Sequence, residues 1–398
     1  MQPVYLDNNA TTRIDPAVLS AMLPYFTEHF GNASSAHSFG AESSAAIKAA
    51  RERVQALIGA EHSHEIVFTS GGTESDNAAI QSALEAQPDR NEIVISAVEH
   101  PAVLSLAMHL HRTRGVAVRV IPVDSRGRLD IAAYKAALGP KTAIASIMWA
   151  NNETGVIFPV AELAEIAHEA GVLFHTDAVQ AAGRIPIDLA AAKIGMLSLS
   201  AHKFHGPKGI GALYVRKGVR FNALIRGGKQ ERGRRGGTEN TPAIAGLGKA
   251  AELAGERLAS GGGERIRLLR DRFEHELLGA INGSSIAGGP RNRLPNTSNI
   301  VFECADGEAI LFGLNKAGVA ASSGSACSSG STEPSHVLRA MKLPYTAALG
   351  AIRFSFSHDN SNDDVNRTLA VLPAIVEKAR EASGFAASGD YAREAAVS

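Results

Sequence analysis

The sequence is poor in cysteine and has no excess of charge of either sign. Only Cys304 and Cys327 occur among 398 residues, so no disulfide framework holds the fold. Lys and Arg number 40 and Asp and Glu number 40, which removes the basic excess expected of a nucleic-acid-binding protein. No apolar run reaches the roughly 18 residues of a membrane helix. The first residues carry neither a basic start nor an apolar signal core, so we expect a cytoplasmic enzyme without membrane or nucleic-acid partners.

Short β-rich runs alternate with helix-like stretches between about residues 65 and 215. Most of the runs are continuously apolar, which is typical of strands covered on both faces and hence of a mainly parallel sheet. The predicted strands are 65–70, 92–98, 116–123, 143–149, 172–176, 196–200 and 209–215. We therefore expect an α/β fold whose large domain contains a mainly parallel seven-stranded sheet.

A run of glycines at 261–263 interrupts an Ala-, Leu- and Arg-rich stretch, and it predicts two helices, or one interrupted helix, that lead out of the sheet domain. The elements predicted beyond it are strands at 299–303 and 351–357 and helices at 308–317 and 363–382, which together indicate a smaller α+β domain. We expect a large domain at 15–258 and a small domain built from 1–14 and 259–398. Cys304, at the end of an apolar run, is interpreted as structural.

Polar residues follow several predicted strands, and ligands of open parallel sheets bind beyond the carboxyl ends of the strands. Gly72 and Thr73 follow the first strand and open a helix, so they form a candidate anion-binding turn. The alternative is an ordinary turn in which Thr73 is an N-cap and Asp76 closes a capping box.

Two further strand ends carry an acid and a lysine. Asp177 follows an apolar strand, so we expect a buried carboxylate that needs a cation, the alternative being a helix cap. Lys203 follows another strand and lies among glycine turns, where desolvation favours a nucleophilic amine. Its alternative interpretation is an ordinary surface lysine.

One cofactor requires all of these groups at once. Pyridoxal phosphate needs a lysine for its aldehyde, an acid for its pyridine nitrogen, an anion cup for its phosphate and a donor for its phenolic oxygen. His100, Asn152 and Gln180, at the remaining strand ends, are candidates to stack on the ring or to donate hydrogen bonds, or else are structural and turn residues. No zinc spacing and no dinucleotide fingerprint occurs in the chain.

Two residues of the second part are candidates for substrate chemistry. Cys327 lies in a Gly- and Ser-rich loop at 321–331, where an accessible thiol is a usable nucleophile; the alternative is a loop cysteine without a role. Arg353 lies in an apolar strand and needs a carboxylate partner, either from an amino-acid substrate or from a structural Asp or Glu.

Eight motifs, in order along nearly the whole chain, resemble those of the cysteine desulfurases. They are 5–12 (YLDNNATT), 73–77 (TESDN), 99–101 (EHP), 151–155 (NNETG), 175–180 (HTDAVQ), 202–209 (HKFHGPKG), 234–240 (RRGGTEN) and 323–327 (SGSAC). Segments 227–233 (GGKQERG) and 333–337 (EPSHV) are most similar to the nitrogenase-associated, NifS-type members. The departures are Gly72, often a bulkier residue in relatives, and an Ala-rich tail after about residue 384.

The resemblance implies a class V aminotransferase of pyridoxal-phosphate fold type I, similar to aspartate aminotransferase and usually a homodimer. It implies that Lys203 carries the cofactor, Asp177 pairs with the pyridine nitrogen and Gln180 with the phenolic oxygen, and His100 stacks on the ring. The remaining implied ligands are Gly72, Thr73, Ser200 and His202 at the phosphate, Thr238 from the partner subunit, and Asn152 and Arg353 at the substrate carboxylate.

The resemblance also implies a reaction. L-cysteine becomes L-alanine, Cys327 takes the sulfur as a persulfide, and an iron–sulfur scaffold protein receives it for nitrogenase maturation. Cys327 is then also a candidate iron–sulfur ligand during transfer only, and His100 a candidate for proton transfer to or from the thiol. The alternatives are a housekeeping desulfurase, a selenocysteine lyase or small-amino-acid aminotransferase of the same fold, and a non-catalytic scaffold.

Overall fold

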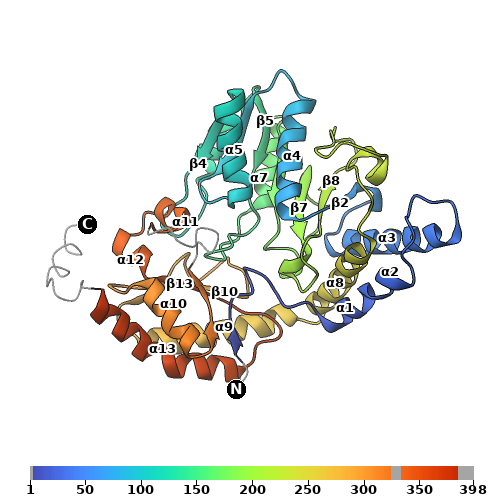
Figure 1. Cartoon of the computed structure of the whole chain (residues 1–398). Helices are drawn as coiled ribbons and strands as arrows, with labels where there is room; N and C mark the ends of the chain where they lie inside the picture. Colours follow the sequence, from blue (N-terminus) through green and yellow to red (C-terminus); the bar gives the residue numbers. More distant parts are fainter. Residues whose placement is uncertain (1–2, 324–332, 384–398) are drawn as a thin grey trace.

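The computed structural model describes residues 3–323 and 333–383 and places a seven-stranded sheet in the upper and right-hand part of Figure 1. Its strands are β2 (Ile66–Thr69), β3 (Glu92–Ser96), β4 (Ala117–Ile121), β5 (Thr142–Ser146), β6 (Leu173–Asp177), β7 (Met196–Ser200) and β8 (Gly211–Val215). The order across the sheet is β2-β8-β7-β6-β5-β3-β4. Every pair is parallel except the two made by β8, which is antiparallel to both neighbours. The prediction of a mainly parallel sheet of seven strands is confirmed.

Both faces of this sheet are covered by helices. Along β2, Ile66 and Phe68 pack into one apolar cluster while Val67 packs into another on the opposite face, because successive strand residues point to opposite sides. One face carries α4 (Gly72–Ala86) and α5 (Pro101–Arg114); the other carries α3 (Ser38–Leu57), α6 (Ile131–Ala137), α7 (Val160–Glu169) and α8 (Thr241–Ala259). This double cover explains the continuously apolar strands.

The second part of the chain has an antiparallel sheet in the order β12-β13-β10-β9. Its strands are β9 (Ser284–Ile286), β10 (Thr297–Phe302), β12 (Ser322–Ser323) and β13 (Ala351–Ser355), and its helices are α9 (Gly262–Ala280), α10 (Gly307–Lys316), α11 (His336–Ala340), α12 (Tyr345–Leu349) and α13 (Asn362–Ala382). The ring of Phe273 packs against those of Phe354 and Phe356 in its core. The two helices predicted around the glycine run are present, separated at Gly261.

Cys304, interpreted from the sequence as structural, lies just outside the strand. Strand β10 ends at Phe302, and Cys304 follows it in a turn with a positive φ of 61° and a partly exposed side chain. The apolar run continues past the end of the strand, so hydrophobicity alone does not show where the chain turns.

The N-terminal segment joins the two parts. Strand β1 (Val4–Tyr5) pairs in parallel with β11 (Val319–Ala320), whereas the N–H of Thr12 donates to the carbonyl of His202 in the large part at 2.9 Å. Two short helices, α1 (Pro16–Met22) and α2 (Pro24–Thr27), follow. None of the helices in 3–323 and 333–383 is long and apolar enough to cross a membrane.

Candidate active site

A cavity of about 710 Å³ lies where the parallel strands of the large sheet end, and α11 contributes to its wall. The structure brings together here ten of the residues singled out from the sequence. They are Gly72, Thr73, His100, Asn152, Asp177, Gln180, Ser200, His202, Lys203 and Arg353. All except Arg353, which lies in β13 of the second sheet, come from the ends of the large sheet's strands or the turns and helices after them, so the topology of the large sheet makes them neighbours.

Asp177 is the last residue of β6, and its side chain is buried at the base of the cavity. One carboxylate oxygen accepts a hydrogen bond from the N–H of Val179 at 2.9 Å. Burial raises the pKa of Asp177, and the opposing effects of His100 and Lys203 do not cancel it. The charges around Asp177 do not offset the cost of burying its carboxylate, so a cationic group of a ligand would stabilise the ionised form.

Lys203 closes the short 3-10 helix η2 (Ala201–Lys203), directly after β7. Its Nζ donates to the carbonyl oxygens of Asn9 and Ala10, each at 2.7 Å. The N-terminal segment therefore holds this amine at the cavity wall. An exposed surface lysine, the alternative interpretation, does not describe this position.

The N-terminus of α4 lies at the turn predicted from the sequence to bind an anion. The helix begins at Gly72 after Gly71, and a Cβ atom at Gly72 would lie 2.7 Å from Cγ2 of Val179, so only glycine fits this contact without a shift. A shallow hollow beside it is lined by Thr73, Ser200 and His202 among others. Main-chain N–H groups at a helix N-terminus favour an anion there.

The alternative of a capping box in this turn is wrong. Thr73 lies inside the helix, whose N-cap Gly71 makes no side-chain cap. The carboxylate of Asp76 is instead buried, with Oδ1 3.7 Å from Nε2 of His175. Burial, followed by the charge of Asp177, raises the pKa of Asp76 well above its ordinary value.

Two imidazoles in the cavity are held neutral. Burial lowers the pKa of His202 to about 4, helped by the charges of Lys203 and Lys208, and its Nδ1 lies 3.1 Å from the hydroxyl of Thr11. His100 is the N-cap of α5, and its Nδ1 accepts from the N–H of Ala102 at 3.1 Å. Since Nδ1 is an acceptor, the proton of neutral His100 lies on Nε2.

Arg353 is almost fully buried in β13 and lines the cavity. Its Nη2 donates to Oδ1 of Asp7 at 2.8 Å and its Nη1 to the carbonyl of Asn152 at 3.0 Å. The structural carboxylate that the sequence left open as an alternative is thus Asp7. Arg353 nevertheless remains at the wall of the cavity, next to Asn152.

One of the predicted site residues, Thr238, does not line this cavity. Thr238 is exposed in the loop that precedes α8, as expected if it serves a partner subunit. Cys327 lies outside the described residues, as does most of its loop. His336, in α11, lines the cavity, and its Nε2 donates to the carbonyl of Glu99 at 2.9 Å.

Several residues at the cavity were not identified from the sequence. Asn9 contributes a main-chain carbonyl that accepts from Lys203 and from Nε2 of Gln180 (3.1 Å), and no sequence pattern reports such a contact. Asp76, which lines the cavity, did offer a signal, since it lies within a motif that also contains Thr73.

The residues present fit pyridoxal phosphate. The buried carboxylate of Asp177 can pair with a protonated ring nitrogen. The main-chain N–H groups at the N-terminus of α4 can bind a phosphate. Lys203 and Gln180 lie in the same cavity, as an aldehyde and a phenolic oxygen require. The donor set is that of an organic cofactor with a cationic end and an anionic end.

Comparison with known proteins agrees with this site. The family model described as aminotransferase class-V matches residues 4–368. The cysteine desulfurase of Gluconacetobacter diazotrophicus is 66% identical over 385 residues, covering 97% of this chain and 96% of that protein. Cysteine desulfurase NifS of Azotobacter vinelandii is 55% identical over 385 residues, covering 97% and 95%. A solved NifS-like protein superposes with a TM-score of 0.88 at 37% identity, covering 95% of this chain and 100% of that one.

The chain therefore belongs to the class-V aminotransferase family, whose members share the pyridoxal-phosphate fold type I described above. Its cofactor is pyridoxal phosphate. Within the family it is a cysteine desulfurase, which converts L-cysteine to L-alanine and transfers the sulfur.

Proposed function

We propose that Lys203 and Cys327 divide this reaction, with Lys203 acting at the substrate Cα and Cys327 at the substrate sulfur. The observation that supports the proposal best is the single cavity shared by Lys203, Asp177 and Arg353. When bound, pyridoxal phosphate supplies a ring that accepts the electron pair released at Cα. Asp177 keeps the ring nitrogen protonated, which strengthens that effect.

The protein groups then move protons and sulfur. Arg353 and Asn152 bind the substrate carboxylate, and the Lys203 amine takes the Cα proton. The Cys327 thiolate forms a bond to the substrate sulfur as the carbon–sulfur bond breaks. Sulfur is thereby oxidised to the sulfane level of a persulfide, while the carbon fragment keeps the bonding electrons, gains protons and leaves as alanine. His100, whose proton lies on Nε2, is the proposed group for proton transfer to or from the thiol, and it would stack on the ring of the bound cofactor.

Reductive trapping tests the assignment of Lys203. Borohydride fixes the cofactor to the amine that holds it, and peptide mapping then identifies the modified residue. Labelling of Lys203 is expected; labelling elsewhere, or none, would refute the proposal.

Substitution of the two cysteines tests the sulfur step. Cys327→Ala is expected to abolish sulfide release from cysteine while the yellow cofactor stays bound. Cys304→Ala is the matched control, since Cys304 lies in a turn outside the cavity. Retained activity in Cys327→Ala would favour a lyase or aminotransferase that does not need the thiol.

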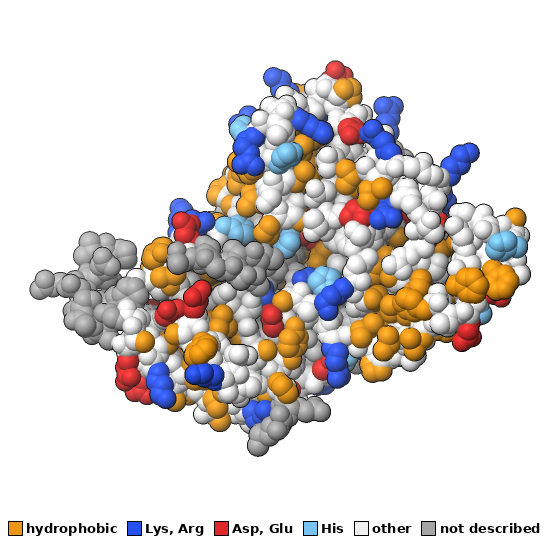
Figure 2. All heavy atoms as spheres, in the orientation of Figure 1, with side chains coloured by type: hydrophobic (Ala, Val, Ile, Leu, Met, Phe, Trp, Pro, Cys, Tyr) orange, Lys and Arg blue, Asp and Glu red, His pale blue; other side chains and the backbone are white. Residues whose placement is uncertain are grey.

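A homodimer is the proposed form in solution. Large apolar side chains gather over α1, α2 and the start of α3, at the right of Figure 2: Leu19, Leu23, Phe26, Phe30 and Phe39 are all at least 44% exposed. An exposed cluster of this kind is typical of a protein interface. The exposure of Thr238 supports its proposed contact with the phosphate site of a partner subunit. Sedimentation of Phe30→Asp against the unchanged protein tests whether this face holds the dimer together.

The proposed acceptor of the persulfide sulfur is an iron–sulfur scaffold protein in the cytoplasm, serving nitrogenase maturation. The name NifS of the Azotobacter vinelandii relative supports this role over a housekeeping one. Capture of acceptors from cells grown with and without fixed nitrogen tests it. Enrichment of a scaffold only under nitrogen-fixing conditions is expected, and equal capture would favour the housekeeping role.

We also propose domain bounds of 15–258 for the large domain and 1–14 with 259–398 for the small one. Val4 and Leu6 support this division, since they pack in the same apolar cluster as Leu269 of α9 and Phe354 of β13. Limited proteolysis is expected to cut near Gly261 before it cuts within either domain.

A further inference from the structure

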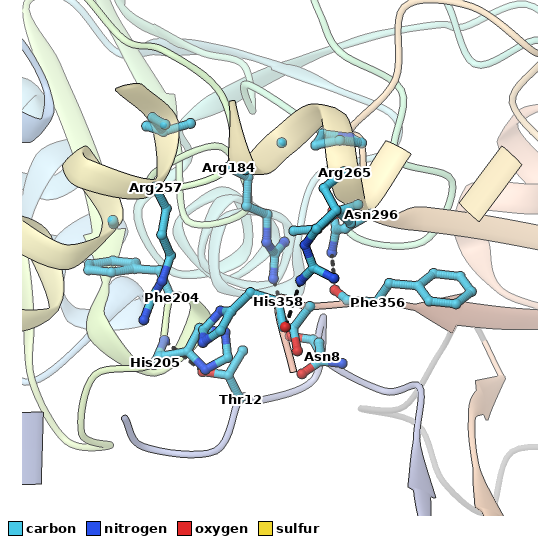
Figure 3. A pocket seen from close by; sticks show the side chains of 18 of the residues that line it. Asn8, Thr12, Arg184, Phe204, His205, Arg257, Arg265, Asn296, Phe356 and His358 are labelled. Atoms are coloured by element: carbon cyan, nitrogen blue, oxygen red, sulfur yellow. Dashed lines mark hydrogen bonds between the residues drawn. The ribbon is translucent and has the colours of Figure 1, made fainter. Parts of the chain in front are cut away.

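Arg184 is a guanidinium that the reaction described above does not use. It lies seven residues after the end of β6 and lines a second cavity of about 360 Å³, whose wall shares Lys203 with the active-site cavity. Figure 3 shows that second cavity, with Arg184 extending toward Asn8 in its wall. Burial, with a smaller effect from Arg353, lowers the pKa of Arg184 to about 9, so the group stays charged at neutral pH.

The partners of Arg184 are carbonyl oxygens and not an acid. Its Nη2 donates to the main-chain carbonyls of Asn8 and Lys203, both at 3.2 Å. Its Nη1 donates to the side-chain oxygen Oε1 of Gln180 and, at 3.3 Å, to that residue's main-chain carbonyl. Among the described residues no ion pair includes Arg184. A buried cation without an acid destabilises a fold, which suggests that it is retained for another reason.

The contact with Gln180 determines which way the amide faces. A guanidinium carries only donors, so it donates to the amide oxygen and excludes the amide NH₂ group from this side. The Nε2 group must then lie on the opposite side, where one hydrogen donates to the carbonyl of Asn9 at 3.1 Å. Gln180 also lines the active-site cavity, so its second hydrogen is available there.

We propose that Arg184 is a positioning residue that locks the Gln180 amide with its NH₂ group toward the phenolic oxygen of the cofactor. This inference rests on the proposed role of Gln180 at that oxygen. Without Arg184 the amide can turn over and present its own oxygen, which repels a phenolate. The donor from Gln180 stabilises negative charge on the phenolic oxygen and so lowers the pH at which the bound cofactor loses its proton.

The competing explanation is purely structural, because Arg184 also holds the main chain of Lys203. A structural loss would lower stability without moving the titration of the cofactor in a defined direction. The pH midpoint of the cofactor's visible absorbance in the holoenzyme separates the two explanations, since it reports the charge balance at the phenolic oxygen and not the turnover rate.

The experiment compares four holoenzymes by this midpoint: unchanged protein, Arg184→Met, Gln180→Ala and the double variant. Arg184→Met and Gln180→Ala should each raise the midpoint by about one pH unit, the size expected for one hydrogen bond to a charged acceptor. The double variant should show no more than the Gln180→Ala shift, because both changes remove the same donor. Arg265→Met is the control: its guanidinium lines the same second cavity but donates to His358 and Asn360. It should leave the midpoint unchanged.

The outcomes are distinguishable. A shift in Gln180→Ala without one in Arg184→Met would overturn this inference and keep the role of Gln180, whereas no shift in either would remove that role as well. If Arg184→Met does not fold, Arg184→Ala assembled with millimolar guanidinium chloride replaces it, since the vacated space adjoins the second cavity. Guanidinium should restore the normal midpoint and equal sodium chloride should not; failure of guanidinium to restore it would count against the inference.

Discussion

The carboxylate of Asp7 lies 2.8 Å from the guanidinium of Arg353, at the cavity where a substrate carboxylate would need the same cation. Arg353 is 2% exposed and Asp7 21%. Asp7 therefore neutralises a buried charge before substrate arrives, and it lowers the positive potential that attracts substrate.

Asp7→Asn removes this charge but keeps an oxygen that accepts from Nη2. We expect KM for cysteine to fall about fivefold, equivalent to about 1 kcal/mol, with little change in kcat. The free energy of unfolding should fall by a similar amount, because Arg353 loses its ion pair. Steady-state kinetics and urea unfolding measure both. An increase in KM would instead show that Asp7 orients Arg353 for substrate.

A substitution at Asp177 should change cofactor binding and protein stability in opposite directions. Asp177→Asn keeps the shape of the side chain and the hydrogen bond from the N–H of Val179. It removes a buried carboxylate whose pKa is raised by burial. We expect the apoprotein to gain about 1 kcal/mol of stability while affinity for pyridoxal phosphate falls at least about tenfold. Urea unfolding and cofactor titration of the apoprotein check the two effects. A variant that binds the cofactor normally would contradict the pairing with its ring nitrogen.

Gly72 and Val179 provide a test of packing at the phosphate cup. A Cβ at Gly72 would lie 2.7 Å from Cγ2 of Val179, so Gly72→Ala should displace the start of α4 and weaken cofactor binding by about 1 to 2 kcal/mol. Val179→Ala removes the clashing atom. The double variant should therefore bind the cofactor more tightly than Gly72→Ala alone, and additive losses would show that steric contact is not the cause.

The large sheet could be predicted because its strands carry a signal within each segment. Strands buried on both faces are mostly apolar, and the residues at or just after their carboxyl ends, such as Asp177 and Lys203, are polar. The topology of parallel strands then places these residues at one edge without any further information.

The contacts that complete the site could not be predicted, because they join distant segments through main-chain atoms. The carbonyl of Asn9 accepts from Lys203, 194 positions away, and any residue can offer a carbonyl. The carboxylate that pairs with Arg353 could not be identified from the sequence either. Asp7 is far from Arg353 along the chain, and nothing in the sequence distinguishes it from the other acids. The short strands β9 and β12 are exposed or polar and carry no apolar run.

Glu99 offers a prediction about pH. Its side chain is fully buried between β3 and β5, where it accepts from the hydroxyl of Ser96 at 2.5 Å and from the N–H of Met148 at 3.0 Å. Burial raises the pKa of Glu99 from 4.5 to about 8, against the opposing effect of these hydrogen bonds. The folded protein therefore keeps a proton on Glu99 that the unfolded chain has lost at neutral pH.

The sign of the effect follows from this difference in bound protons. Between pH 4.5 and about 8 the folded state binds one more proton than the unfolded state, so stability falls as pH rises. This group alone contributes a slope of up to about 1.4 kcal/mol per pH unit.

Glu99→Gln imitates the protonated form, so this substitution should leave stability nearly unchanged near pH 5 and should stabilise the fold increasingly toward pH 8. Urea unfolding of the apoprotein across this range measures the difference. Glu165→Gln, on the exposed side of α7, makes the same chemical change at the surface and should give a curve parallel to that of the unchanged protein. A constant offset for Glu99→Gln across the range would show that Glu99 is ionised in the folded state.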